Sequence, residues 1–447
     1  MKNAARSLLT LAFVVFGMHP TAPGQVKPPG GLGFEFQDYR LRNGLRIILS
    51  EDDALPLVTV AVAYGAGTVR EKPGQEGLAY LLENLMFRGS ENVSSLQHVG
   101  FIQKVGGELN ATTTLDKTLF YQTLPTNYLA LALWLESDRM KSLAITPAAI
   151  DITRAQLLQG HQDRLARDPY LESYSRLDEL LYPDFLYGHP LIGSGGEMRN
   201  LAEKDILEFH QTYYVPNNAV LCIVGNIEIS KTKELISRYF ETIPPGIDIS
   251  SPPLPVFRQA GEVEQALPGI LSASTGFHLG FRFYPLQTGD AYSLKILEYI
   301  LLKGETSRLR SRLLRRDPPL ANHLSGGLEE RGGVLALKIL CLNNNSVMAE
   351  RARRAILSEI DKIRANPVSA DELAKAKQLF KTGYLRRLST RLGRALFLVD
   401  AAFSGKPLDT LNGELDKYMR VNPPTLQSLV TRHFVPQNKV VVELGQR

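Results

Sequence analysis

One acidic side chain stands inside an apolar helix pattern in the first quarter of the chain. In GLAYLLENLMFRGS, residues 77–90, apolar residues recur at helical spacing and predict a helix with one buried stripe. Glu83 lies within that stripe, and Tyr80 and Asn84 stand one helical turn apart beside it. A carboxylate in such a place can take part in proton transfer. It can also serve the fold alone, through a hydrogen bond to Tyr80 or to a backbone amide.

The positions of the histidines determine whether two His on one helix could bind zinc near this acid. The sequence has 8 His, and no two of them lie within four residues of each other. A pair of His at i and i+4 on one helix, whose ring nitrogens can converge on one zinc ion, is therefore excluded anywhere in the sequence.

Composition places the chain among soluble globular proteins. Its 447 residues are 44% hydrophobic and 22% charged, with a formal net charge of +5. No Lys/Arg cluster is interleaved with aromatic residues, so nucleic-acid binding is not expected. No Gly-rich phosphate loop follows a strand pattern, so no nucleotide site is expected. Cys222 and Cys341, both in strand-like segments, are expected as buried thiols, with one disulfide as the alternative.

The first residues have the layout of a secretory signal peptide. Lys2 and Arg6 precede an apolar run from Leu8 to Met18, and small, Pro and Gly residues follow it. We expect residues 1–24 to be removed and the mature protein to be periplasmic or secreted. No later stretch approaches the ~18 apolar residues of a membrane span, so no span is expected after cleavage. The alternative is an uncleaved N-terminal anchor.

The two halves of the sequence share one plan. FHQTYYVPNNAVLCIVGN (209–226) and VTRHFVPQNKVVVELGQ (430–446) have the same order of aromatic residues, Val-Pro-x-Asn, strand and Gly. Their prolines are 436 − 216 = 220 positions apart, and the same offset links Pro147 to Pro367. The agreement of two unrelated segments on one offset indicates a duplicated domain.

A proline-rich segment separates the two halves. IPPGIDISSPPLP has five prolines from Pro244 to Pro255, a composition suited to an extended linker. We therefore expect a linker at 244–257 between an N-terminal domain at 34–243 and a C-terminal domain at 258–447.

Each half mixes short β-rich runs with amphipathic helices. LRIILSE, LVTVAVAYGAG and VLALKILCL have strand patterns with hairpin-like spacing, and DAYSLKILEYILL has a helix pattern. We expect an α+β fold of two homologous layered α/β domains with mostly antiparallel sheets. SSLQHV (94–99) is expected to be a loop, and RARRAILSEIDKIRAN (351–366) the solvated face of a helix, both without a functional role.

The segment around Glu83 resembles the inverted zinc-binding helix of the pitrilysin and insulinase metallopeptidase family, which includes the mitochondrial processing peptidases. The family pattern is His-x-x-Glu-His within a very similar Gly-Leu-Ala…Met-x-Phe-x-Gly frame. The resemblance extends along most of the sequence, through VGGELNATTTLDKTLFY, FLYGHPLIGSGGEMRNL and ETSRLRSRLLRRDPPLAN. It implies two homologous α/β domains that close like a clam shell around a peptide.

The resemblance implies zinc, but the ligand positions carry other residues here. Tyr80 and Asn84 stand where the family has its two His, and alignment through the DPY triplet puts Gly160 at the third ligand, a Glu. A phenol with a pKa near ~10 and an amide oxygen are poor zinc ligands, and Gly has no side chain to donate. We therefore expect no zinc. Glu83, the family's general base, is expected to be vestigial, because no Lewis acid activates a water for it.

The resemblance also implies residues that hold a peptide. The family has an Arg and a Tyr for this purpose, and here Arg315 is followed at 322 − 315 = 7 positions by Asn322 in place of the Tyr. Arg315 could instead be a solvated charge that ends a helix. GGELNATTTLDKTLFY matches a strand at an open sheet edge onto which substrate backbone adds, with Gly107, Asn110 and Ala111 in register. The alternative is an ordinary hairpin strand.

Three functions are consistent with these patterns. Family members often work in pairs, in which one subunit bears zinc and a degenerate sister closes the chamber. The first function is thus a non-catalytic subunit that binds unfolded peptides together with a zinc-bearing sister chain. The second is a stand-alone peptide-binding scaffold. The third is an active zinc metalloendopeptidase with unusual ligands.

Overall fold

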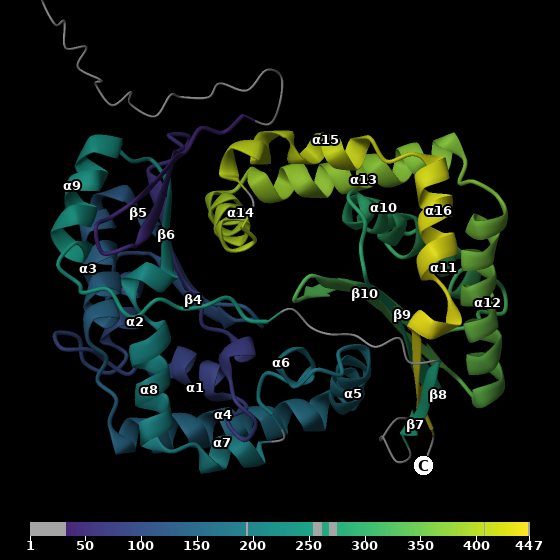
Figure 1. Ribbon diagram of the computed structural model, residues 1–447, viewed down its shortest axis with the longest axis horizontal. Coiled ribbons are helices and arrows are strands. Elements are labelled where there is room, and N and C mark those ends of the chain that lie inside the picture. Colours follow the sequence, from purple (N-terminus) through teal and green to yellow (C-terminus); the bar gives the residue numbers. More distant parts are fainter. Residues whose placement is uncertain (1–32, 194, 254–261, 268–274, 406, 446–447) are drawn as a thin grey trace, which may run out of the picture.

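The computed structural model describes residues 33–193, 195–253, 262–267, 275–405 and 407–445. The expected signal peptide lies outside the described residues, as does part of the proline-rich linker. The described chain forms two β-sheets, each covered by helices, in two halves of similar construction (Figure 1). The prediction of an α+β fold with two homologous layered halves is confirmed. The exact domain boundaries stay predictions.

The first sheet contains, within the described residues, six strands: β1 Gln37–Arg40, β2 Arg46–Glu51, β3 Leu57–Tyr64, β4 Glu108–Thr113, β5 Thr118–Pro125 and β6 Ala219–Gly225. Their order across the sheet is β1-β2-β6-β3-β5-β4. Neighbours run antiparallel except β2 and β6, which are parallel. The continuous apolar runs of β3 and β6 place these strands in the middle of the sheet, where both faces are buried.

The second sheet repeats this topology. Its five described strands are β7 Val263–Leu267, β8 Thr275–Phe283, β9 His323–Arg331, β10 Val334–Asn343 and β11 Lys439–Leu444. Their order is β7-β11-β8-β10-β9, and the parallel pair β7 and β11 corresponds to β2 and β6 of the first sheet, which has β1 in addition. β4 and β9 are therefore equivalent edge strands.

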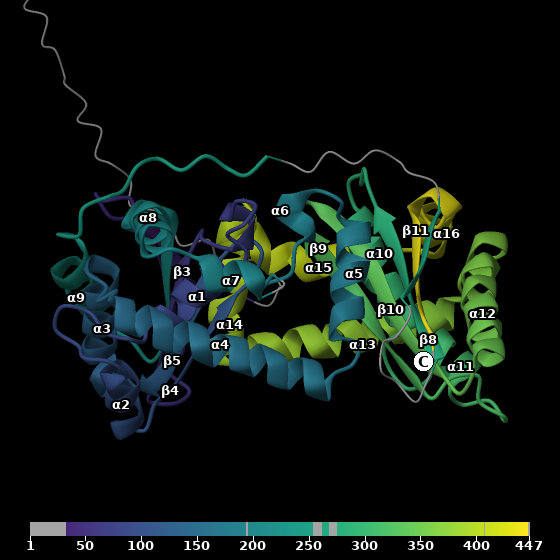
Figure 2. The same cartoon turned by 90° about the horizontal axis from the view of Figure 1, so that it is seen from below.

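Helices surround both sheets. Those of the first half are α1 Leu78–Leu85, α2 Gln97–Lys104, α3 Leu129–Lys141, α4 Pro147–Arg167, α5 Leu171–Leu181, α6 Phe185–Gly188, α7 Gly196–Asn200, α8 Glu203–Tyr213 and α9 Ile229–Phe240. Those of the second half are α10 Asp290–Leu301, α11 Arg308–Leu313, α12 Ser346–Ala365, α13 Ala370–Leu388, α14 Arg391–Phe403, α15 Glu414–Met419 and α16 Pro423–His433. In both views α4 runs from the helices of the first half towards α5 (Figures 1 and 2).

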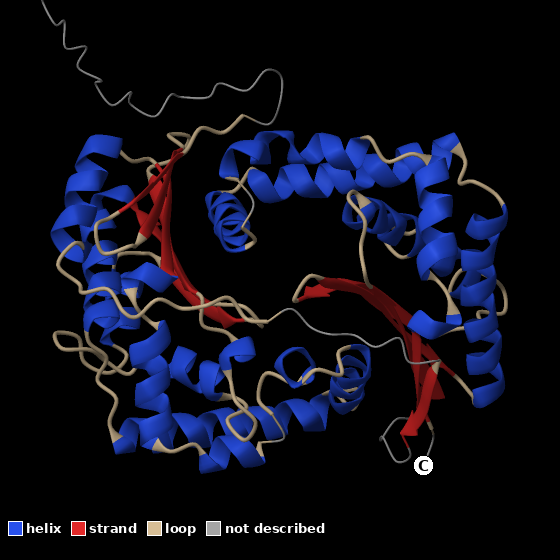
Figure 3. Ribbon diagram, viewed as in Figure 1, coloured by secondary structure: helices blue, strands red, loops and turns tan. Residues whose placement is uncertain are grey.

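Each half lends one helix to the sheet of the other half. Leu398 of α14 shares a buried core with Ile48 and Cys222 of the first sheet. Leu177 of α5 shares a buried core with Ala336 and other residues of the second sheet. The two helices are equivalent, because their first residues are 391 − 171 = 220 positions apart. Each sheet thus lies between the helices of its own half and one helix of the other half (Figure 3).

An Arg of the host sheet reaches the C-terminal end of each lent helix. Arg46 Nη1 donates to the carbonyl oxygen of Ala402 at 3.2 Å, at the end of α14. Arg282 Nη1 donates to the carbonyl oxygen of Leu181 at 3.0 Å, at the end of α5. A positive charge is favourable there because the last carbonyls of a helix lack partners and carry the negative end of its dipole. The reciprocal exchange is therefore stabilised by both apolar and polar contacts.

Several local expectations can be compared with the structure. Both cysteines are free and buried, as preferred from the sequence. The loop expected at 94–99 is wrong in its second part, because α2 begins at Gln97 and buries His98, whose Nε2 lies 3.2 Å from Gln122 Oε1. Among the described residues, none of the helices combines the length and the apolar character that a membrane crossing requires.

Candidate functional site

Glu83 lies in α1, which packs against both the edge strand β4 and helix α4. Its side chain is buried, and Oε2 accepts a hydrogen bond from Thr113 Oγ1 at 2.6 Å. The main-chain N–H of Thr113 also acts on this carboxylate. Burial raises the pKa of Glu83, and the hydroxyl and main-chain N–H of Thr113 oppose that rise. The partner of Glu83 is thus the end of the edge strand and not Tyr80.

A second acid fixes the beginning of α1. Glu71 accepts hydrogen bonds from the main-chain N–H groups of Gly77 at 3.1 Å and Ala79 at 2.8 Å, which have no partners within the helix. Burial raises the pKa of Glu71 to about 8, and His189 Nδ1 lies 3.7 Å from its Oε2. Sequence reasoning missed this residue. An acid a few residues before a predicted helix was the available signal.

The three zinc-ligand positions of the family lie on α1 and α4. Asn84 Nδ2 donates to the carbonyl oxygen of Tyr80 at 2.8 Å, and both side chains are partly buried. Gly160 is exposed, and a Cβ added there would meet nothing within 4 Å. Arg88, three residues after the end of α1, donates through Nε to Thr153 Oγ1 of α4 at 3.0 Å. The two helices that bear the positions are thus in contact.

This donor set does not fit zinc. A phenol and an amide oxygen stand where imidazole nitrogens are needed, and the third position offers no donor atom. Glu83, the remaining acid of the motif, is engaged with Thr113. Within the described ranges, no group of three or more His, Cys, Asp or Glu side chains could hold a metal ion.

The residues expected to receive a peptide are Asn110 and Ala111 in the edge strand β4 and Gly107 directly before it. In the described part of the chain β4 pairs with β5 alone. The N–H of Ala111 is turned away from β5, since it is bonded to the Asn110 Oδ1 atom at 2.8 Å. A Cβ at Gly107 would lie 2.8 Å from Ile102 Cγ2, so glycine is needed for the close approach of α2 to the strand. The peptide-binding role of Gly107, Asn110 and Ala111 stays a prediction.

The structure places Arg315 and Asn322 in the second half, away from α1 and β4 in the fold. Arg315 follows the end of α11, is about half exposed, and pairs through Nη2 with Glu305 Oε2 at 2.9 Å. Asn322, just before β9, donates through Nδ2 to Asn344 Oδ1 at 2.6 Å. Both side chains have partners of their own. The role of both residues in peptide binding stays a prediction. The alternative, that Arg315 is a surface charge, also stays a prediction.

A cleft of about 1020 Å³ opens where the two halves meet. Its lining includes Thr113 at the end of β4, His161 of α4, His189, and Glu329 and Arg331 of β9. The two equivalent edge strands therefore both reach this cleft. Among the described residues, Tyr80, Glu83, Asn84 and Gly160 do not line it.

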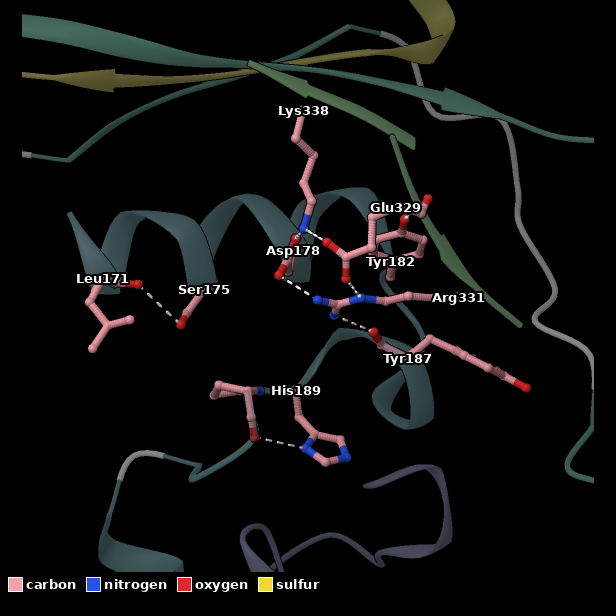
Figure 4. A network of polar contacts seen from close by, with 10 residues as sticks. Leu171, Ser175, Asp178, Tyr182, Tyr187, His189, Glu329, Arg331 and Lys338 are labelled. Atoms are coloured by element: carbon pink, nitrogen blue, oxygen red, sulfur yellow. Dashed lines mark hydrogen bonds and ion pairs between the residues drawn. The ribbon is translucent and has the colours of Figure 1, made fainter. Parts of the chain in front are cut away.

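Four charged side chains join the halves beside this cleft, and three of them, Asp178, Glu329 and Arg331, line it (Figure 4). Asp178 of α5 binds Arg331 Nη2 through Oδ2 at 2.6 Å and Lys338 Nζ through Oδ1 at 2.6 Å. Glu329 pairs with the same two cations. Burial raises the pKa of Asp178 against the pull of Arg331 and Lys338. Sequence reasoning missed this network because its members lie far apart along the chain.

Two family models match successive parts of this chain. The model of the insulinase family, peptidase family M16, matches residues 46–172, and the model of the peptidase M16 inactive domain matches residues 200–380. Together these ranges take in more than half of the chain. This chain belongs to the insulinase family of peptidases. The share of a relative's length that matches this chain differs from one relative to the next.

The insulinase-family relatives include proteins named as zinc proteases. The zinc protease PqqE of Helicobacter pylori is 25% identical over 356 residues, which cover 78% of this chain and 79% of that protein. The mitochondrial-processing peptidase subunit beta of Blastocladiella emersonii is 25% identical over 209 residues, which cover 46% of this chain and 44% of that protein. The chain thus spans less than half the length of the second relative.

Solved structures share the insulinase-family fold over almost the whole chain. A protease from Helicobacter pylori superposes with a TM-score of 0.85 at 23% identity, covering 92% of this chain and 99% of that one. A peptidase M16 inactive domain from Pseudomonas fluorescens superposes with a TM-score of 0.82 at 17% identity, covering 92% and 98%. At this level of identity the likeness concerns the fold.

Proposed function

We propose that this chain is a non-catalytic subunit of an exported, two-chain insulinase-family peptidase, in which it forms half of the peptide-binding chamber. One observation carries the proposal: Tyr80, Asn84 and Gly160 occupy the family's ligand positions and together cannot bind zinc firmly. Without zinc, no water of lowered pKa is available to Glu83. Catalysis then depends on a sister chain with an intact His-x-x-Glu-His helix.

The peptide-binding part of the proposal is supported by the geometry of β4. A strand that pairs on one side only presents main-chain donors and acceptors to an extended peptide, which can add as a further strand. Such binding depends little on side chains and therefore suits unfolded peptides of varied sequence. The cleft at the end of β4 offers room for the side chains of the bound peptide.

Two relatives support the two-chain arrangement and export. The periplasmic protease PqqL of Escherichia coli superposes with a TM-score of 0.76 at 15% identity, with 93% of this chain covering 48% of that one. That protein is thus about twice as long as the matched fold, as a pair of chains would be. The mitochondrial-processing peptidase is named by its subunits. Export is also supported by the signal-peptide pattern at 1–24.

The experiment uses the mature chain purified alone and together with a family member encoded beside it that retains His-x-x-Glu-His. Zinc content is measured by mass spectrometry, and cleavage is measured with a fluorescence-quenched peptide in the presence and absence of a chelator. We expect little zinc and no chelator-sensitive cleavage for the chain alone. The pair should bind one zinc and cleave the peptide. Zinc near one equivalent and chelator-sensitive cleavage by the isolated chain would contradict the proposal.

A further inference from the structure

The two halves carry one short segment in common around their buried acids. LLENLMFRG (81–89) and ILEYILLKG (296–304) share Leu-Glu, an apolar run, a basic residue and Gly in the same positions. Glu83 and Glu298 are 298 − 83 = 215 positions apart, and both are buried on equivalent helices, α1 and α10. The glycines that end the segments both have positive φ. Glu298 is therefore the counterpart of Glu83.

The two acids also bind equivalent groups. Glu83 Oε2 accepts the hydroxyl of Thr113 in β4 at 2.6 Å, and the main-chain N–H of Thr113 also acts on this carboxylate. Glu298 Oε1 accepts the main-chain N–H of Leu328 in β9 at 3.3 Å. Thr113 and Leu328 are 328 − 113 = 215 positions apart, the same offset as that of the acids. In each half, one buried carboxylate thus holds the same residue of the edge strand.

These contacts decide which edges can accept a further strand. In an antiparallel strand, alternate residues direct their N–H and C=O groups away from the partner strand, and an added peptide needs those groups. A main-chain N–H that donates to a helix carboxylate is already satisfied. Displacing the N–H would deprive a buried carboxylate of a hydrogen bond, which is costly. Each acid therefore closes the edge at the residue that it binds.

The basic residue of the shared segment makes the two edges unequal. Lys303 Nζ donates to the carbonyl oxygen of Gly326 in β9 at 2.9 Å and lies 3.3 Å from Glu298 Oε1. β9 is thus closed at two outward groups. Its counterpart Arg88 turns away from β4 and binds Thr153 of α4. On β4 the outward N–H before Thr113 belongs to Ala111, whose partner is the side chain of the neighbouring Asn110.

We propose that Glu83 and Glu298 are equivalent clamps of the edge strands β4 and β9, and that Glu298 with Lys303 closes β9, so that of these two equivalent edges β4 is the one that accepts a peptide. Glu83 is then a positioning residue that holds the end of β4, which explains its retention without the zinc ligands. The part that concerns peptides rests on the proposed peptide-binding function.

Hydrogen exchange of the full chain tests the clamps. Glu83→Leu should speed exchange in 108–115 about tenfold, because about 1.4 kcal/mol of local protection corresponds to that factor. Glu83→Gln should stay near the wild type, since the amide oxygen still accepts the N–H. Glu298→Leu and Glu298→Gln should behave in the same way at 323–331. The Glu298 variants serve as controls for exchange in 108–115, and the Glu83 variants serve as controls for exchange in 323–331. Equal exchange in the Leu variant and the wild type, or equal loss in the Gln and Leu variants, would overturn the clamp.

Peptide titration tests the closed edge. A fluorescein-labelled unstructured peptide rich in Val and Thr is titrated into the wild type and into Glu298→Leu combined with Lys303→Met. The wild type should bind one peptide per chain, and the variant should bind two. One site in both proteins would overturn the closure of β9 and leave the proposed function standing. If the wild type binds no peptide, the proposed peptide binding fails. If a site then appears in the variant alone, the closure of β9 is supported. If neither protein binds the peptide, the closure of β9 is contradicted.

Discussion

Arg331 Nη2 lies 2.6 Å from Asp178 Oδ2, and this pair joins the edge strand of the second sheet to a helix that belongs to the first half. Lys338 of β10 binds the other carboxylate oxygen of Asp178. One carboxylate of α5 therefore holds two strands of the opposite half. Because the side chains of Asp178 and Arg331 are largely buried, solvent screens their attraction less than that of a surface pair.

Removal of this carboxylate should destabilise the chain. Asp178→Ala leaves Glu329 as the one acidic partner shared by Arg331 and Lys338, and we expect a loss of about 2 kcal/mol in the free energy of unfolding. The urea midpoint and slope measure the loss. Asp248→Ala, at an exposed Asp, is the control and should change the midpoint little. An unchanged midpoint for Asp178→Ala would mean that the network contributes nothing to the contact between the halves.

The lent helices should each stabilise the sheet of the other half. Leu398→Ala in α14 and Leu177→Ala in α5 each empty a fully buried site, which costs about 2–4 kcal/mol. Hydrogen exchange should rise in the first sheet for Leu398→Ala and in the second sheet for Leu177→Ala. Leu55→Ala, at an exposed Leu, is the control. A rise confined to the half that carries the mutation would contradict the reciprocal exchange.

The buried His278 should make the chain less stable in acid. Burial lowers the pKa of His278 from 6.5 to about 4, with Lys338 acting in the same direction, and its Nε2 lies 2.7 Å from Ser173 Oγ. As pH falls below about 6.5, the unfolded state takes up a proton before the folded state does. Stability is therefore lost between pH 6.5 and 4, by about 3 kcal/mol from this group.

Urea unfolding at several pH values measures this loss. His278→Gln should reduce the slope of stability against pH in that window, while part of the slope remains because burial also lowers the pKa of His98 to about 3 and that of His210 to about 4. His323→Gln, at an exposed His, should leave the slope unchanged. Identical slopes for the wild type and His278→Gln would refute the prediction.

Restoring the family's ligands should restore zinc binding. In Tyr80→His/Asn84→His/Gly160→Glu, two imidazoles and a carboxylate stand at the three positions, and the new Glu has room because a Cβ at position 160 meets nothing within 4 Å. We expect about one zinc per chain by mass spectrometry, against little in the wild type. The double variant without Gly160→Glu should bind zinc more weakly. No zinc in the triple variant would show that these positions do not converge.

The sequence by itself determined the local elements and the repetition of the fold. The helical spacing around Glu83 predicts α1, the apolar run of VLALKILCL predicts β10, and the offset of 220 predicts two similar halves. The residue types at positions 80, 84 and 160 already determine that the donor set is unsuited to zinc. These features depend on spacing and side-chain chemistry, which can be read along the chain.

Only the tertiary structure decided which side chains meet across the halves. An apolar helix face fits either sheet, so the sequence of α14 or α5 cannot tell that each packs on the sheet of the other half. The partner of Glu83 also depends on how β4 lies beside α1, thirty residues later in the sequence. Hydrogen bonds and ion pairs require atoms within about 3 Å, and that proximity arises from packing of distant segments.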